Sequence, residues 1–403
     1  MKKTVFLTVF FIFCAFIICS LLPVKKDTQT VIKFSSWGSK SEVSIIRTAI
    51  DDFEKNNPGI KVNLMHIPQN YFQKIQLLFA SGLEPDVVFF NNQNIQMYIN
   101  AGLLEDLSPY FPDLENRFYK EALGCFKKDN RLYAVPRDIS NLVIYYNKDI
   151  FKKSGVKIPP KIKDIYELKE LAAKLTNEEH FGINFEDNPM YWLYYAASNG
   201  GGIISDDGKK LLINSPETIE ALDLYAQMLN NDNSMPSKAQ AGSMTQAQMF
   251  INGKLAMYLS GRWMTPKIRE TAVFDWDVTE FPAKEKIYID ASGWALAKNS
   301  KHKKEAAALI KYLSGTDALS RFAASGLIVP ADRTAVMQDK SQKPENYTAF
   351  TEMLKNAAPS PVNENYAVIL DIIKEKTGSI FNGKKSAEEA FDEKTVKKLE
   401  NLL

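Results

Sequence analysis

No group of residues in this sequence has the types and spacing of a catalytic or metal site. His66, His180 and His302 lie far apart, and neither an H-E-x-x-H pattern nor a cysteine pair accompanies them, so no metal site is predicted. The chain also lacks a P-loop, a G-x-G-x-x-G turn and a G-x-S-x-G elbow. A pair of glycosidase carboxylates stays open, since aspartates and glutamates are plentiful, but no position supports it.

Side chains suited to binding a solute stand on several loops. Binding requires shape, hydrogen bonds and stacking surfaces rather than a catalytic group. A carboxamide run occupies 91–94, a polar run occupies 137–141, and a tryptophan closely follows a glycine at Trp263 and at Trp294. The sequence therefore favours a binding protein over an enzyme.

The composition is that of a globular protein large enough for two cores. The chain has 403 residues, of which 45% are hydrophobic and 24% are charged. Its net charge of +2 gives no electrostatic reason to expect a nucleic-acid partner. Only Cys125 lies outside the N-terminal segment, so no internal disulfide is expected in the body of the protein.

The N-terminal segment has the pattern of an export signal. Lys2 and Lys3 precede an uncharged, mostly apolar run, Val5–Leu22. No A-x-A cleavage site follows, and neither cysteine of the run follows a small residue, as lipidation would require. We therefore expect residues 1–29 to be an export signal or membrane anchor, with residues 5–22 retained or cut atypically and the body outside the membrane.

The chain after residue 30 begins with a β-α-β pattern. The stretch 31–38 is typical of a strand, and Ser39 with Glu42 forms a capping box for the helix that follows. Apolar residues then recur at helical spacing up to Phe53, and 60–67 is a second strand. Such a unit predicts a parallel sheet.

The stretch 131–151 is the predicted point where the chain leaves one domain and enters another. A short apolar strand, 132–135, should end at Pro136, because proline donates no hydrogen bond to a sheet. A polar loop, 137–141, then precedes the apolar strand Leu142–Tyr146. Two buried strands joined by a polar loop suit a hinge facing a cleft, although an ordinary edge loop would give the same pattern.

Strand and helix patterns alternate along the rest of the chain, which predicts the α/β class. Further strands are expected at 86–90, 181–183, 290–298 and 327–330, an aromatic helix at 190–199, and late helices at Asn365–Lys374 and Ser386–Leu399.

Several blocks resemble family 1 extracellular solute-binding proteins, the sugar receptors of ABC importers, of which maltose-binding protein is a member. The sequence around the predicted hinge, at 133–136 and 144–155, resembles the family pattern Y-A-V-P followed by L-x-Y-N-K-D-x-F-K-K-x-G. The block 250–263 matches F-x-x-G-K-x-A-M-x-x-x-G-x-W in full, and 53–62 and 80–87 follow family patterns. At Asp164-Ile165 the family usually has Thr-Trp, a departure that concerns packing more than the ligand.

The resemblance implies a periplasmic-binding-protein-like fold of type II. Two α/β domains would be joined by a hinge with more than one crossing, and the ligand would lie in the cleft between them. The expected first domain comprises 30–138 and 291–335, and the second comprises 139–290 and 336–403.

Resemblance and loop position together select the candidate ligand residues of the first domain. Trp37, Ser39 and Glu42 follow the first strand, although Ser39 and Glu42 could act only as helix caps. Asn92 and Gln93 lie on the carboxamide loop, where capping of the next helix is the alternative. Asp138 and Ser140 lie in the hinge, where Asp138 could simply pair with Arg137.

The remaining candidates lie beyond the hinge. Trp192 is chosen from the aromatic helix, whose rings cannot all face the cleft. Arg262 and Trp263 follow a strand of the second domain, and Gly293 and Trp294 lie on the strand that returns to the first. Both Trp263 and Trp294 could instead be core residues.

The predicted function is capture of a carbohydrate, a small oligosaccharide or sugar derivative, and its delivery to ABC permease subunits. We expect a monomer without a cofactor, a metal or a nucleic-acid partner. The alternatives are a receptor for a non-sugar solute such as glycerol phosphate or a polyamine, a ligand sensor, and a secreted glycoside hydrolase.

Overall fold

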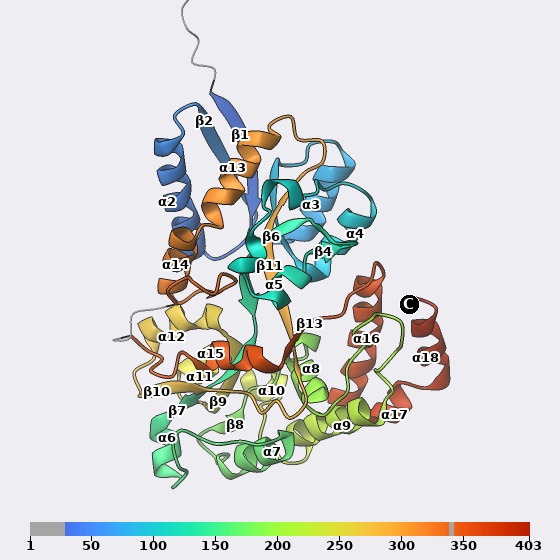
Figure 1. Cartoon of the computed structure of the whole chain (residues 1–403). Coiled ribbons are helices and arrows are strands. Elements are labelled where there is room, and N and C mark those ends of the chain that lie inside the picture. Colours follow the sequence, from blue (N-terminus) through green and yellow to red (C-terminus); the bar gives the residue numbers. More distant parts are fainter. Residues whose placement is uncertain (1–28, 338–341) are drawn as a thin grey trace, which may run out of the picture.

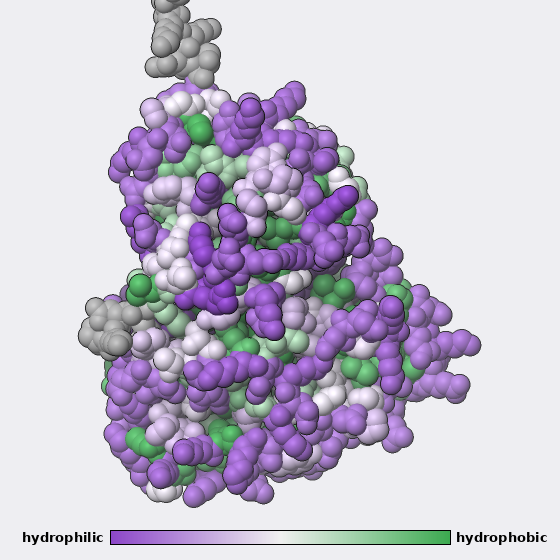
Figure 2. Space-filling model, in the orientation of Figure 1, coloured by the Kyte–Doolittle hydropathy of each residue, from purple (hydrophilic) through white to green (hydrophobic). Residues whose placement is uncertain are grey.

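The computed structural model describes residues 29–337 and 342–403. The predicted export signal or anchor, residues 5–22, lies outside the described residues. Figure 1 shows two lobes, one above the other, with strands passing between them. Figure 2 shows a narrowing between the lobes on the same face, whose surface is mostly hydrophilic.

The first lobe is built on a sheet whose strand order is β12-β6-β11-β3-β1-β2, with β13 paired to β11. Strands β1, β2 and β3 are parallel, whereas β11 runs antiparallel to both β3 and β6. The strands span β1 Thr30–Ser36, β2 Ile60–His66, β3 Val87–Asn91, β6 Ala134–Ser140, β11 Ile287–Leu296, β12 Val329–Pro330 and β13 Ala357–Pro359.

The second lobe has a four-stranded sheet in the order β10-β7-β9-β8. Strand β7 is antiparallel to β9 and to β10, while β8 is parallel to β9. The strands span β7 Leu142–Asn147, β8 Phe181–Ile183, β9 Leu255–Gly261 and β10 Trp276–Thr279. A separate small hairpin joins β4 Lys127–Lys128 to β5 Arg131–Leu132.

Helices cover both sheets, as the α/β class requires. In the first lobe, α2 and α13 lie on one side of the sheet and α3 and α4 on the other (Figure 1). The longer helices span α2 Lys40–Asn56, α3 Tyr71–Ala80, α4 Asn92–Asn100, α7 Ile165–Lys174, α8 Pro189–Ser198, α9 Pro216–Asn230, α13 Lys303–Leu313, α14 Thr316–Ala324, α16 Tyr366–Phe381 and α18 Glu393–Glu400. The shorter ones span α5 Lys120–Gly124, α6 Lys148–Lys153, α10 Lys238–Ala241, α11 Gln246–Ile251, α12 Thr265–Thr271, α15 Ala349–Glu352 and α17 Ala387–Ala390.

The prediction that the strand before the hinge ends at Pro136 is wrong. Strand β6 continues to Ser140, and β7 begins two residues later. The pairing with β11 joins Gly293 to Pro136 and Ser292 to Asp138, so Arg137 is an extra residue on β6. A strand tolerates proline at such a bulge, because the ladder is already interrupted there.

Two other expected elements differ from the structure. The helix expected at Ser386–Leu399 is split into α17 and α18, and the second begins after its own cap, Asp392. Ser386 and Glu389 do form the expected capping box. At α2 only half of the expected box exists: Ser39 accepts a hydrogen bond from the Glu42 N–H, whereas the Glu42 carboxylate contacts Arg137.

Within residues 29–337 and 342–403, three segments connect the lobes. The chain crosses from β6 to β7 through Asn141, along β11, and along the segment that leaves β12 for α15 (Figure 1). These crossings agree with the predicted multi-crossing hinge of a type II binding fold. The precise domain boundaries stay a prediction, and β13, from the segment assigned to the second domain, pairs with β11.

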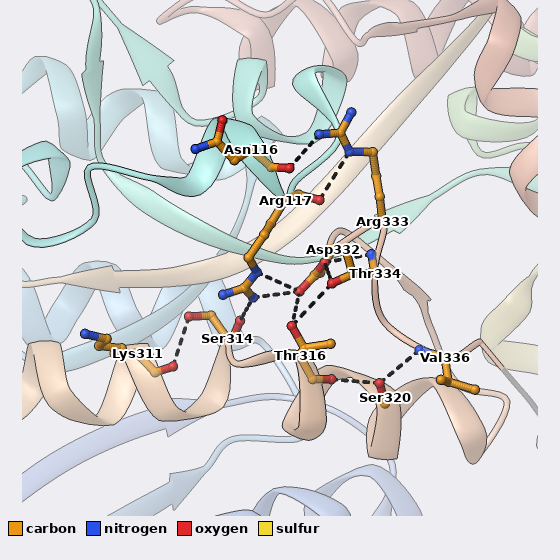
Figure 3. A network of polar contacts seen from close by, with 10 residues as sticks. All are labelled: Asn116, Arg117, Lys311, Ser314, Thr316, Ser320, Asp332, Arg333, Thr334 and Val336. Carbon is orange, nitrogen blue, oxygen red and sulfur yellow. Dashed lines mark hydrogen bonds and ion pairs between the residues drawn. The ribbon is translucent and has the colours of Figure 1, made fainter.

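The third crossing is fastened to the first lobe by Asp332. Its carboxylate accepts hydrogen bonds from Arg117 at 2.6 Å, from Thr316 at 2.8 Å, and from Thr334 (Figure 3). Burial would raise the pKa of Asp332, but these donors outweigh it and the pKa is lowered. The segment therefore leaves the first lobe from a fixed point.

Candidate functional site

In each sheet, several strands, β7 and β11 not among them, have their carboxyl ends at the hinge, including β3 and β6 in the first lobe and β9 in the second. Strand β6 ends at the crossing and is parallel to β3, because both are antiparallel to β11. In the second lobe, Gly261 at the end of β9 pairs with Leu142 at the start of β7. The carboxyl edge of each sheet therefore faces the other lobe, and open α/β sheets bind ligands outside this edge. This is the candidate site.

At the first-lobe edge, Trp37 lies in an aromatic group directly after β1. Its ring is half-buried, with its centroid 4.3 Å from that of Phe89 and 4.9 Å from that of Tyr71. Ser39 caps α2 by accepting a hydrogen bond of 3.3 Å from the Glu42 N–H. The loop thus has a defined conformation, which presents the Trp37 ring near the edge.

Glu42 and Asp138 are brought together by Arg137. Arg137 Nη1 lies 2.7 Å from Glu42 Oε1, and Arg137 Nε lies 2.6 Å from Asp138 Oδ2. Burial would lower the pKa of Arg137, but the two carboxylates outweigh it and raise that pKa. The predicted ion pair between Arg137 and Asp138 therefore exists, and Glu42 extends it to three members.

Asn92 and Gln93 bind a carboxylate of the strand beside them. Asn92 Nδ2 lies 3.0 Å from Asp290 Oδ1, and Gln93 Nε2 lies 2.8 Å from Asp290 Oδ2. The cap of α4 is instead Asn91, which accepts from the Asn94 N–H. Burial raises the pKa of Asp290, against hydrogen bonds from Asn92, Ser360 and Gln93.

Ser140 lies beside this cluster. It is half-buried at the end of β6 and pairs with Asp290 across the sheet. The next residue, Asn141, is buried and donates from Nδ2 to the Phe350 carbonyl at 2.9 Å. Through the pairing of Ser140 with Asp290, the crossing from β6 to β7 and the crossing along β11 run side by side at this point.

Three of the four aromatic residues of α8 are buried. Trp192 is 1% exposed, Tyr194 accepts a hydrogen bond from the Leu142 N–H at 2.8 Å, and Tyr195 packs against Tyr225 and Phe281. Tyr191 is half-buried. Among the four, Tyr191 is thus the ring that solvent reaches most easily.

Arg262 connects the lobes from the second-lobe edge. Its Nη2 donates to the Ala323 carbonyl of α14 at 3.2 Å and to the Met337 carbonyl at 2.9 Å. Its guanidinium carbon also lies 5.3 Å from the centroid of the Phe350 ring. Burial lowers the pKa of Arg262 to about 10. The residue therefore has a structural partner on the opposite lobe.

The two tryptophans that follow glycines have different surroundings. Trp263 is half-buried beside Gly261 at the carboxyl edge of β9. Trp294 is 1% exposed, with Phe89 and Phe322 at centroid distances of 6.1 and 6.4 Å. A methyl group on Gly293 would lie 2.5 Å from the Val135 carbonyl oxygen, so the close approach of β6 and β11 requires glycine there.

The fold thus brings some of the candidate residues together and buries others. Glu42 with Asp138, and Asn92, Gln93 with Ser140, form two polar clusters at the first-lobe edge. Trp192 and Trp294 are packed into the lobes. Ligand contact by any of the twelve candidates stays a prediction.

Two residues of this region were missed in the sequence. Asp290 is a charged residue inside an apolar run, and this contrast with its neighbours could have marked it as a candidate. Glu186 follows β8 at the second-lobe edge, where its N–H and C=O both bind the Tyr225 hydroxyl at 3.0 Å. Burial and the neighbouring Asp187 raise the pKa of Glu186 to about 7. Tyr225 lies on α9, and no local sequence pattern shows its contact with the Glu186 backbone.

The described residues also bear on pockets, metal sites and membrane-spanning helices. A pocket of about 690 Å³ between α2, α13 and α14 includes none of the candidates. Within 29–337 and 342–403, no three His, Cys, Asp or Glu side chains are grouped to hold a metal ion. No helix in those ranges is long and apolar enough to cross a membrane.

Comparison with known proteins gives consistent matches. A family model described as bacterial extracellular solute-binding protein matches residues 37–319. A putative binding protein of Brucella abortus is 28% identical over 345 residues, covering 82% of this chain and 83% of that protein. The multiple sugar-binding protein of Streptococcus mutans is 26% identical over 326 residues, covering 75% and 76%. An ABC substrate-binding protein of Listeria monocytogenes, in complex with cycloalternan, has a TM-score of 0.82 at 27% identity, covering 93% and 97%.

Proposed function

Because the chain belongs to the family of bacterial extracellular solute-binding proteins, we propose that its solute is a carbohydrate, a small oligosaccharide or sugar derivative. The sugar-binding relative and the structural neighbour in complex with cycloalternan support this class. A sugar presents hydroxyl groups to planar polar side chains and an apolar face to aromatic rings. Both kinds of side chain stand at the candidate site.

The observation that carries the proposal is the pair of facing carboxyl edges. The first-lobe edge offers the indole of Trp37 and the carboxylate of Glu42, and the second-lobe edge offers the indole of Trp263. These groups stand on different lobes, so a solute would contact all of them only when the lobes close. Closure about the hinge would then signal that the receptor is loaded.

The loaded receptor would deliver its solute to the permease subunits of an ABC importer in the membrane. We place the body of the protein outside the cytoplasmic membrane as a monomer, anchored by residues 5–22. The solute would be bound and released unchanged, because the site supplies hydrogen bonds and stacking without a recognised catalytic pair. Fractionation of cells tests the location: a shortened chain in the soluble fraction would reject the anchor and keep the export signal.

A thermal-shift screen followed by calorimetry tests the solute class. The full-length chain would be purified in a detergent without a sugar head group and screened against maltotriose, cycloalternan, glycerol 3-phosphate and spermidine. We expect a rise in melting temperature with an oligosaccharide, and saturable heat of binding with one solute per chain.

The other outcomes each point to a different function. A shift only with glycerol 3-phosphate or spermidine would replace the carbohydrate by a non-sugar solute. Hydrolysis of the oligosaccharide during the measurement would favour a glycoside hydrolase. Binding without any effect on uptake in a permease-containing strain would favour a ligand sensor.

A further inference from the structure

Arg137 occupies an unusual position in the hinge strand. It is the extra residue of the β6 bulge, so its side chain does not follow the regular alternation of the strand. Its carbonyl accepts a hydrogen bond from the Ala331 N–H at 3.0 Å, which fixes the backbone from the other side. A bulge redirects a side chain, and here the redirected guanidinium reaches the first turn of α2.

The guanidinium binds two carboxylates through different nitrogen atoms. Nη1 lies 2.7 Å from Glu42, which is 95 residues away in the sequence, and Nε lies 2.6 Å from Asp138. The guanidinium is planar and rigid, so these bonds orient the two carboxylates relative to each other. With all three groups ionised, two negative charges surround one positive charge and a net negative charge remains.

Glu42 is the most accessible member of the three. Its side chain is 14% exposed, against 7% for Arg137 and 5% for Asp138. Its second oxygen lies against the loop after β1, because a methyl group on Gly38 would be 2.4 Å from Glu42 Oε2. The oxygen that Arg137 does not bind therefore lies beside Gly38, in the loop that follows the carboxyl end of β1.

The same guanidinium also supports the aromatic part of the edge. Its central carbon lies 4.3 Å from the centroid of Phe89, and that ring lies 4.3 Å from the ring of Trp37. A cation over an aromatic ring is attracted to it. Glu42 and Trp37, the two candidates after β1, are thus both arranged around Arg137.

From this arrangement we infer that Arg137 is a positioning residue of the solute site, which holds the Glu42 carboxylate at the edge as an acceptor for solute hydroxyl groups. Asp138 acts on the solute through Arg137 and not by contact. The part of this inference that concerns the solute rests on the proposed function. The placement of Glu42 by Arg137 does not, and it can be measured without any solute.

Carboxyl labelling tests that placement. The full-length chain is treated with a carbodiimide and glycine ethyl ester, and labelling at each carboxylate is measured by mass spectrometry. We expect Glu42 to be labelled several-fold faster in Arg137→Met than in the original chain. The control is Arg321→Met, which removes an exposed partner of Asp52 on the same lobe and should leave Glu42 labelling unchanged. Equal labelling of Glu42 in the original chain and in Arg137→Met overturns the inference.

Maltotriose affinity tests the link to the solute. Arg137→Met and Glu42→Gln should each weaken binding roughly tenfold or more, and the double variant should be hardly weaker than Glu42→Gln. Arg137→Lys should recover part of the loss, since lysine keeps the charge but not the two-pronged geometry. Additive losses in the double variant would mean that Arg137 acts on the solute independently and would overturn the inference.

Two controls remain. Melting curves identify variants that are not folded, and maltotriose binding by the original chain tests the carbohydrate proposal itself. A variant that loses melting temperature is compared only at temperatures where it is folded, and Arg137→Lys provides a milder second variant. Failure of maltotriose to bind the original chain counts against the carbohydrate proposal, while the labelling result still decides whether Arg137 places Glu42.

Discussion

The indole of Trp263 occupies the space that a side chain at Gly261 would need. A methyl group on Gly261 would lie 1.9 Å from Cζ3 of Trp263 and 2.2 Å from Cη2. Gly261 is the last residue of β9 and pairs with Leu142 at the first crossing. The absence of a side chain at one residue thus determines where an aromatic ring lies at the second-lobe edge.

Replacement of Gly261 by alanine should displace this ring. The added methyl group cannot share the space, so the half-buried indole has to move, at a cost of about 1–3 kcal/mol in unfolding free energy. Tryptophan emission should shift, and maltotriose affinity should fall roughly tenfold if Trp263 stacks on the solute. Gly59→Ala is the control, because no atom beyond its two chain neighbours lies within 4 Å of its added methyl group. An unchanged emission spectrum in Gly261→Ala would contradict the prediction.

The two tryptophans that follow glycines should respond differently to alanine. Trp294 is buried between Phe89 and Phe322, so its loss leaves a cavity and should cost about 3–5 kcal/mol in unfolding free energy. Trp263 is half-buried, so its loss should cost less stability and chiefly weaken maltotriose binding. Urea unfolding and calorimetry distinguish the two effects. Weak binding by a fully folded Trp294→Ala variant would show that this ring also serves the solute.

Asp332→Asn should loosen the third crossing. The carboxylate is fully buried and binds Arg117, Thr316 and Thr334, so its loss should cost about 2–4 kcal/mol in unfolding free energy. Asp52→Asn on the same lobe removes a more exposed ion pair and should lower the stability far less than Asp332→Asn. Equal unfolding midpoints in urea for the two variants would show that the buried network contributes little.

The pH dependence of the Asp332 network follows from the direction in which the pKa of Asp332 is shifted. The pKa of Asp332 is lowered in the folded protein, so its contribution to stability is present above the ordinary pKa of an aspartate. That contribution is lost as the pH falls toward the lowered pKa. The stability difference between the original chain and Asp332→Asn should therefore shrink in acid, as melting curves between pH 3 and pH 7 would show.

Glu186 should give the opposite trend. Its pKa rises from 4.5 to about 7 on folding, so below 4.5 it is protonated in both states and its contribution to stability is complete. Between these values the unfolded chain loses the proton first, and the contribution declines until the pH exceeds about 7. As the pH rises from 5 to 8, the stability of Glu186→Gln relative to the original chain should therefore increase.

The control for that experiment is Glu178→Gln, an exposed glutamate in the same lobe. Melting temperatures of the three chains at pH 5 and pH 8 give the comparison. A constant difference between Glu186→Gln and the original chain would mean that Glu186 does not titrate in this range.

The sequence by itself determined several of the elements and their order. The β-α-β start, the two apolar strands around the hinge, and the block 250–263 were read from spacing and from a family pattern, and each has its counterpart in the fold. These signals are local: a strand or helix shows its pattern within a few turns of the chain. The capping box at Ser386 was readable for the same reason.

Only the tertiary structure decided the partners of the side chains. Glu42 had the pattern of a cap, yet its carboxylate binds Arg137, because the bulge in β6 turns that residue toward α2. Trp263 and Trp294 both follow glycine closely, and only the neighbouring elements make one half-buried and the other a core residue. Such contacts join residues that are far apart in the chain, so no pattern of near neighbours contains them.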